Sequence, residues 1–172
     1  MGLPYALGEE LTERFVKIRF TLDPKDWEGL NSESLWAHEM APGEYQIRNS
    51  PFYIYGISAE DVVYAKEIDG ILDFISISKR GGHSTYRILL NEGENVESPQ
   101  FIKHWQLLQR MGCTYEQAKS RWLAVDVPPE TDIFATYRFL ENGETAKVWT
   151  FEEAHCGHPV KDDNQSSPET HH

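Results

Sequence analysis

The feature that most constrains the fold is a succession of short segments, between residues 15 and 90, in which apolar and polar side chains alternate. The first is "FVKIRFTL", and "SESLWAHEM", "VVYAKEI", "ILDFISISK" and "TYRILL" are among those that follow. Because successive side chains of a β-strand point to opposite faces, this pattern predicts strands with one buried face. Turn-rich stretches such as "DPKDWEGLN" separate them. Residues 15–90 are therefore expected to form a small β-barrel or meander of about six strands, with aromatic residues such as Trp36 in its core.

The pattern changes after residue 91. Phe101, Trp105 and Leu108 recur at helical spacing. The Ser98-Pro99 pair before them suits the N-cap and first position of a helix. The sequence thus predicts a helix that begins near residue 99.

Shorter elements are expected downstream of this helix. Residues 114–117, "TYEQ", match a capping box and predict a second helix that extends to about residue 122. A third helix is predicted over residues 130–142, and strands over 123–128 and 146–154. Residues 91–155 are therefore expected to form a split β-α-β half that resembles a ferredoxin-like layer. Packed with the β-rich half, it completes an α+β fold.

Both ends of the chain are expected to lie outside these halves. Residues 1–14 form a polar lead-in, and the polar, proline-spaced residues 156–172 predict a disordered tail. No signal-peptide pattern is visible, and no apolar run approaches the roughly 18 residues of a transmembrane helix. These observations predict a cytoplasmic protein that has no membrane partner.

The formal net charge is −12 at pH 7, from 28 acidic and 16 basic side chains. Such a surface repels the phosphate backbone, and the basic residues are scattered rather than gathered in a stripe, so no nucleic-acid partner is expected. The acidity either confers solubility or faces a basic protein partner. The sequence leaves a monomer and a homodimer both open.

Residues 79–87, "KRGGHSTYR", are the strongest candidate for a binding site. The two glycines offer backbone N–H groups that could hold an anion, with Arg80 and Arg87 nearby. This hypothesis places an anion or ligand site at Arg80, Gly82, His83, Ser84 and Arg87. His83 and Ser84 are neighbours in an extended segment, so they do not form a base–nucleophile pair, and no catalytic residue is predicted. The alternative is a glycine bulge or hairpin turn that joins two strands.

No metal or cofactor is expected. His155, Cys156 and His158 lie close together, but no second ligand pair stands elsewhere in the chain, and Cys113 is too distant in sequence to supply one. The glycine-rich and lysine-containing motifs that bind nucleotides are missing from the sequence.

Several short motifs resemble those of a bacterial family, the domain of unknown function 4265, over roughly residues 15–155. The family carries no established activity, so the resemblance implies no catalytic residue. Its most specific elements are Leu35-Trp36-Ala37, Asn49 with Pro51-Phe52, Asp61-Val62-Val63, Gly82-His83-Ser84-Thr85 with Arg87, and Gly112.

Two functional hypotheses follow. The first is an acidic binding protein, such as an immunity protein that neutralises a basic toxin, for example a nuclease. The alternative is an enzyme or a sensor that holds an anionic small molecule at residues 81–85. Because no recognisable set of catalytic residues is visible in the sequence, the first hypothesis is favoured, and the protein is not expected to be an enzyme.

Overall fold

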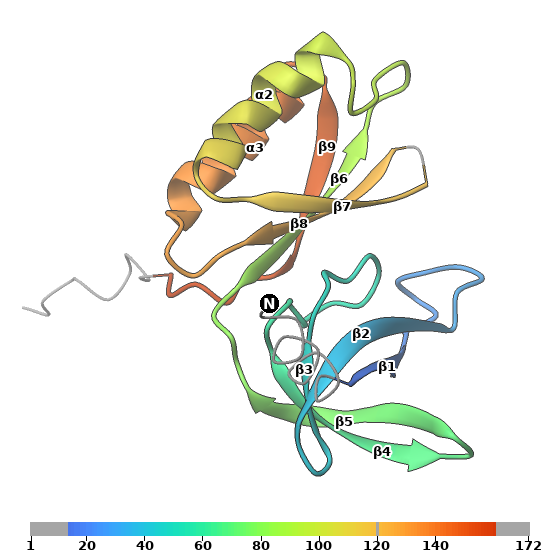
Figure 1. Cartoon of the computed structure of the whole chain (residues 1–172). Helices are drawn as coiled ribbons and strands as arrows, with labels where there is room; N and C mark the ends of the chain where they lie inside the picture. Colours follow the sequence, from blue (N-terminus) through green and yellow to red (C-terminus); the bar gives the residue numbers. More distant parts are fainter. Residues whose placement is uncertain (1–13, 120, 161–172) are drawn as a thin grey trace, which may run out of the picture.

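The structure, a computed structural model, describes residues 14–119 and 121–160. It contains two β-sheets, one above the other in Figure 1, and two helices that lie against the upper sheet. The α+β fold class predicted from the sequence is confirmed, with most of the elements being strands. No helix in the described part of the chain is both long and apolar enough to cross a membrane.

The first sheet contains five strands that follow one another along the chain. Neighbouring strands pair antiparallel, and β1 also pairs with β5 in parallel, over two residue pairs. Alternate side chains point inward to a core that contains Ile18, Leu35, Ile47 and Val63, all at most 1% exposed. The strands are β1 (Phe15–Thr21), β2 (Ser32–Ala41), β3 (Glu44–Ile47), β4 (Val62–Ile68) and β5 (Ile71–Lys79).

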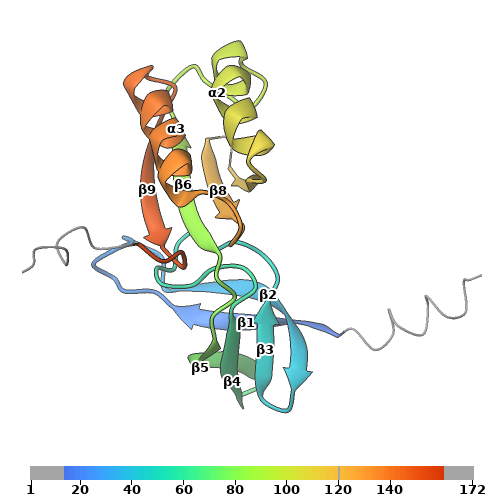
Figure 2. The same ribbon diagram turned by 90° about the vertical axis from the view of Figure 1, so that its left-hand side faces the viewer.

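The second sheet contains four strands in the order β7-β8-β6-β9, and all neighbours are antiparallel. Two helices run side by side across one of its faces (Figure 2). They bury a second core around Trp105, Leu123, Leu140 and Trp149. The elements are β6 (Ser84–Leu90), α2 (Pro99–Arg110), β7 (Thr114–Ala118), β8 (Trp122–Val127), α3 (Ile133–Thr145) and β9 (Trp149–His155).

Two sequence predictions within this half are corrected. Residues 114–118 form strand β7, not a helix, because β8 offers these residues a complete antiparallel partner. Strand β6 belongs to the second sheet, so the boundary between the halves precedes residue 84 instead of following residue 90. The first sheet accordingly has five strands, not six.

The predicted start of α2 fits the structure, whereas α3 begins and ends three residues later than the predicted helix over residues 130–142. Proline 99 occupies the first turn of α2 after Ser98. Helix α3 begins after Asp132, whose carboxylate accepts hydrogen bonds from the N–H groups of Phe134 and Ala135. Gly112, just beyond α2, has a φ of 100°, which glycine adopts without strain. Pro99 and Gly112 therefore mark the two ends of α2, and the Asp132 cap marks the start of α3.

The predicted ends of the chain are tested only in part. The lead-in, except for Arg14, and residues 161–172 lie outside the described residues. The beginning of the predicted tail is packed instead of free, because His158 is buried and hydrogen bonded to two neighbouring segments.

Candidate functional site

The loop that joins β3 to β4, residues 48–61, lies between the two sheets (Figure 1). It packs on the face of the second sheet that the helices leave open. The indole of Trp122 donates to Phe52 O at 3.0 Å, and the Ser58 and Thr85 hydroxyls lie 2.6 Å apart in a fully buried contact. This loop is therefore the main connection between the two halves of the fold.

Glu33 of β2 fastens the loop. Its carboxylate is almost buried and accepts three consecutive backbone N–H groups, from Phe52, Tyr53 and Ile54, at 2.7–3.1 Å. Sequence reasoning missed this role, because a glutamate at the start of an alternating strand is usually exposed.

Asp61 is a second buried carboxylate, and it holds the segment that connects the sheets. It accepts hydrogen bonds from Ser58 N and Gly81 N, both at 2.9 Å, and from Arg80 Nη1 at 3.0 Å. Any side chain at Gly81 would collide with the backbone of Glu60, which itself has a φ of 71°. The tight approach explains why glycine is required here.

The two glycines of the Gly81–Thr85 segment thus form neither a hairpin turn nor a bulge within one sheet. Residues 80–83 carry the chain from β5 in the first sheet to β6 in the second. Gly82 has a φ of 86°, which permits the change of direction. The hairpin prediction is wrong because the two strands that flank the glycines pair with different neighbours.

His83 lies against Asp126 of β8. Its Nδ1 is 2.9 Å and 3.1 Å from the two carboxylate oxygens, and both side chains are mostly buried. Burial raises the pKa of Asp126 above its ordinary value, and the hydrogen bond from His83 offsets part of that rise. His83 and Arg80 line a common pocket of about 440 Å³.

Ser84 lies in a different environment. Its Oγ is 2.6 Å from His158 Nδ1, and it accepts a hydrogen bond from Gly157 N. The other ring nitrogen of His158 lies 2.8 Å from Pro128 O. Because the Ser84 side chain is fully buried, no substrate reaches its hydroxyl, and the pair fastens the end of the described chain to β6.

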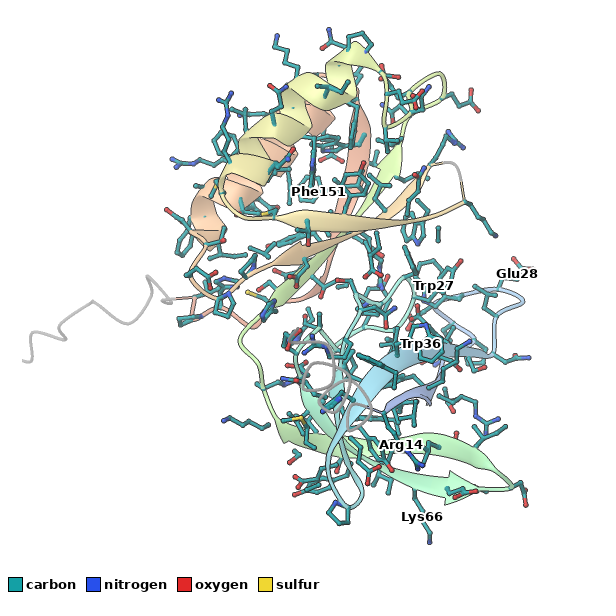
Figure 3. The ribbon with its side chains drawn as sticks, viewed as in Figure 1. Arg14, Trp27, Glu28, Trp36, Lys66 and Phe151 are labelled. Carbon is teal, nitrogen blue, oxygen red and sulfur yellow. The ribbon has the colours of Figure 1, made fainter. Side chains whose placement is uncertain are left out.

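Arg87 is also fully buried, between the two sheets. Its Nε donates to Glu152 at 2.9 Å and its Nη1 to Ile54 O at 3.0 Å. The guanidinium stacks on the ring of Tyr55 at 4.4 Å, and Trp27 lies 5.6 Å away. Figure 3 shows Trp27 in this region between the sheets.

The five residues predicted to form one anion site therefore do not converge. The structure brings Arg80 and His83 to one pocket, next to Gly82. Ser84 faces the helix side of the second sheet and Arg87 faces the opposite side, because alternate side chains of β6 point to opposite faces.

The outer surface of the first sheet has an unexpected composition. Trp36, which the sequence assigned to the core, is 48% exposed. Other large apolar side chains of the same sheet are exposed to a similar extent. We call six of these the outer face: Phe15, Trp36, Tyr64, Ile68, Ile71 and Ile75. Met40 of β2 is also exposed, but it lines the pocket of Arg80 and His83.

The described residues contain no group of three His, Cys, Asp or Glu side chains that could hold a metal ion. His155 and Cys156 lie near His158 in sequence, but His158 uses its ring nitrogens in the contacts with Ser84 and Pro128.

Comparison with protein families gives a match. The family model described as a domain of unknown function, DUF4265, matches residues 33–151. The chain belongs to this family. The resemblance drawn from the sequence motifs is thereby confirmed, and the motifs that contain Phe52, Asp61 and Thr85 lie where the two halves of the DUF4265 fold meet.

No curated protein matches the sequence. Among solved structures, the chain is similar to a hypothetical protein from Neisseria gonorrhoeae, with a TM-score of 0.70 and 19% sequence identity. The match covers 84% of this chain and 96% of the other. At this level of identity, the likeness shows that this DUF4265 protein shares its fold with the gonococcal protein.

Proposed function

We propose that this DUF4265 protein binds another protein through the outer face of its first sheet. The observation that carries the proposal is the set of six large apolar side chains left exposed on one sheet. Soluble monomers rarely expose a contiguous apolar patch of this kind unless it is an interaction site.

The strand register makes the patch continuous. Trp36 of β2 pairs with Lys17 of β1, whose Nζ lies 4.9 Å from the centre of the indole ring. The parallel pairing of β1 with β5 brings Lys17 beside Ile71, and Ile71 pairs with Ile68 across the β4–β5 hairpin. A row of outward side chains thus crosses four strands, with Lys17 between Trp36 and Ile71.

Charge supports a basic partner. Exposed Glu67 and Asp69 flank Ile68 at the tip of the hairpin, and the whole chain carries a net charge of −12. An acidic protein attracts a basic one and accelerates its association. A cytoplasmic immunity protein that neutralises a basic toxin, such as a nuclease, fits these properties. The outer face would then cover the phosphate-binding surface of the toxin.

Purified toxin candidates, beginning with the product of the adjacent gene, provide the test. Calorimetry is expected to give tight binding to a basic protein that weakens from low to high salt. Ile71→Ser and Trp36→Ser are each expected to weaken binding at least tenfold, because truncated residues at an interface centre commonly cost about 1–2 kcal/mol or more.

Phe134→Ser is the matched control, since Phe134 is a similarly exposed aromatic residue on α3, far from the first sheet. Equal losses in all three variants would overturn the proposal. Sedimentation of the isolated protein measures its oligomeric state and is the second test. A homodimer that Ile71→Ser dissociates would show that the outer face binds a second copy instead of a basic partner.

We also infer two finer features of the architecture. The short β1–β5 pairing supports a small barrel for the first five strands. The element order β-α-β-β-α-β, with β8 inserted between β6 and β7, supports a ferredoxin-like arrangement for the second half.

A further inference from the structure

The pocket beside His83 is lined by both charged and apolar side chains. It opens outside the first sheet, where β2–β5 approach the connecting segment 80–83, and it encloses about 440 Å³. That volume lies within the usual range for small-molecule sites. We propose that this pocket binds a small molecule that carries a phosphate or carboxylate group next to an apolar part.

Three cationic or hydrogen-bonding side chains on its wall are available for an anion. Lys79 makes no ion pair or hydrogen bond within the described residues, and Arg80 uses only Nη1. His83 uses Nδ1 toward Asp126, and its Nε2 has no partner in the same part of the chain. Such groups bind phosphate and carboxylate oxygens by charge-assisted hydrogen bonds.

Buried carboxylates hold two of these groups in place before any ligand arrives. Asp61, which is 1% exposed, fixes Arg80, and Asp126 fixes the ring of His83. A binding group whose position is already fixed loses less conformational entropy when the ligand binds. The left-handed φ of Glu60, on the same wall, is a further sign of a constrained site, because such strain concentrates where geometry serves function.

Among the described residues, Glu60 and Asp61 each contact an arginine and Asp126 contacts His83, so Lys79 is the cation on the pocket wall that no carboxylate contacts. Glu60 is the acidic side chain on the pocket wall, and Arg48 lies 3.3 Å from its carboxylate and offsets its charge. Met40, which is 54% exposed, and Val62 provide an apolar surface. The lining therefore favours an anionic head group with an apolar body over a free inorganic ion.

This site differs from the one expected from the sequence. It keeps Arg80 and His83, adds Lys79, and leaves out Ser84 and Arg87, which are buried in other contacts. It is also separate from the outer face, so the failure of either proposal leaves the other standing.

The test is a titration with phenyl phosphate, followed by the amide signals of the folded protein in two-dimensional NMR, with phenol as the uncharged control. Binding is expected in the millimolar range, about 1 mM. It should shift the amides of residues 60–62 and 79–83, and phenol should not shift them.

Lys79→Gln is the informative variant, because Lys79 has no structural partner to lose. It is expected to weaken phenyl phosphate binding about fivefold to tenfold. Lys66→Gln removes the same charge from the neighbouring strand β4, outside the pocket, and should leave the affinity unchanged. His83→Phe, which cannot donate a hydrogen bond, should also weaken binding.

Three results would overturn the inference. The first is the absence of shifts at residues 79–83 up to about 10 mM phenyl phosphate. The second is an equal effect of Lys79→Gln and Lys66→Gln, which would indicate diffuse charge attraction. The third is an equal response to phenol, which would indicate that only the apolar wall binds.

Discussion

The substitution Glu33→Gln tests how the two halves are joined. Oε1 of Glu33 accepts from Tyr53 N and Ile54 N, and Oε2 accepts from Phe52 N at 2.7 Å. The glutamine carbonyl can replace Oε1, but its NH₂ group cannot accept from Phe52. One nearly buried N–H group then lacks an acceptor, which costs about 1–3 kcal/mol of unfolding free energy.

Urea unfolding followed by tryptophan fluorescence measures this loss. With a slope of about 2 kcal/mol per molar urea, the midpoint should fall by roughly 0.5–1.5 M. Glu28→Gln is the control, because Glu28 is an exposed glutamate in the adjacent loop and should leave the midpoint unchanged. If Glu33→Gln unfolds like the wild type, the loop does not depend on this carboxylate and the reasoning is refuted.

Three further predictions concern buried groups. Burial lowers the pKa of His155, so the unfolded chain binds a proton at this side chain more readily than the folded one. The free energy of unfolding should therefore decline as the pH falls through about 6.5. Urea titrations of His155→Gln should show a smaller decline. Gly143→Ala should lower the melting temperature by several degrees, because the added Cβ would collide with the Trp149 indole. Burial raises the pKa of Cys113 to about 11, so at pH 8 a thiol reagent should modify Cys156 first and Cys113 only slowly.

Each of these has a decisive contrary result. An unchanged pH slope in His155→Gln would mean that other groups produce it. Gly93→Ala is the comparison, because Gly93 lies in an open turn with a positive φ, where an added Cβ meets no other atom. A Gly143→Ala variant as stable as Gly93→Ala at pH 7 would show that α3 can shift away from β9. Equal reaction rates of the two thiols would contradict the burial of Cys113.

The alternating pattern correctly indicated strands over β1, β2 and β5, because one face of each is buried whatever sheet it joins. It did not indicate which sheet β6 joins. That strand is buried on both faces, and its partners, β8 and β9, lie 32 or more residues further along the chain. Pairing between such distant segments is decided by packing, which local periodicity does not record.

The same limit applies to the candidate site. The motif of residues 79–87 pointed to the correct region, and Arg80 and His83 do share a pocket. The two-residue period of a strand already places Ser84 and Arg87 on opposite sides of the second sheet, but adjacent letters could not show that both side chains are buried. Nor could they show Asp126 beside His83, since the two are 43 residues apart.

The sequence by itself determined the secondary structure of most segments, the position at which α2 begins, and the excess of negative charge. These properties depend on side-chain period, capping and composition, which are local or additive. Only the tertiary structure decided that β6 leaves the first sheet, that Glu33 and Asp61 become buried acceptors, and that the outer face stays uncovered. Each of these depends on which distant segments meet, and that is settled by the packing of the whole chain.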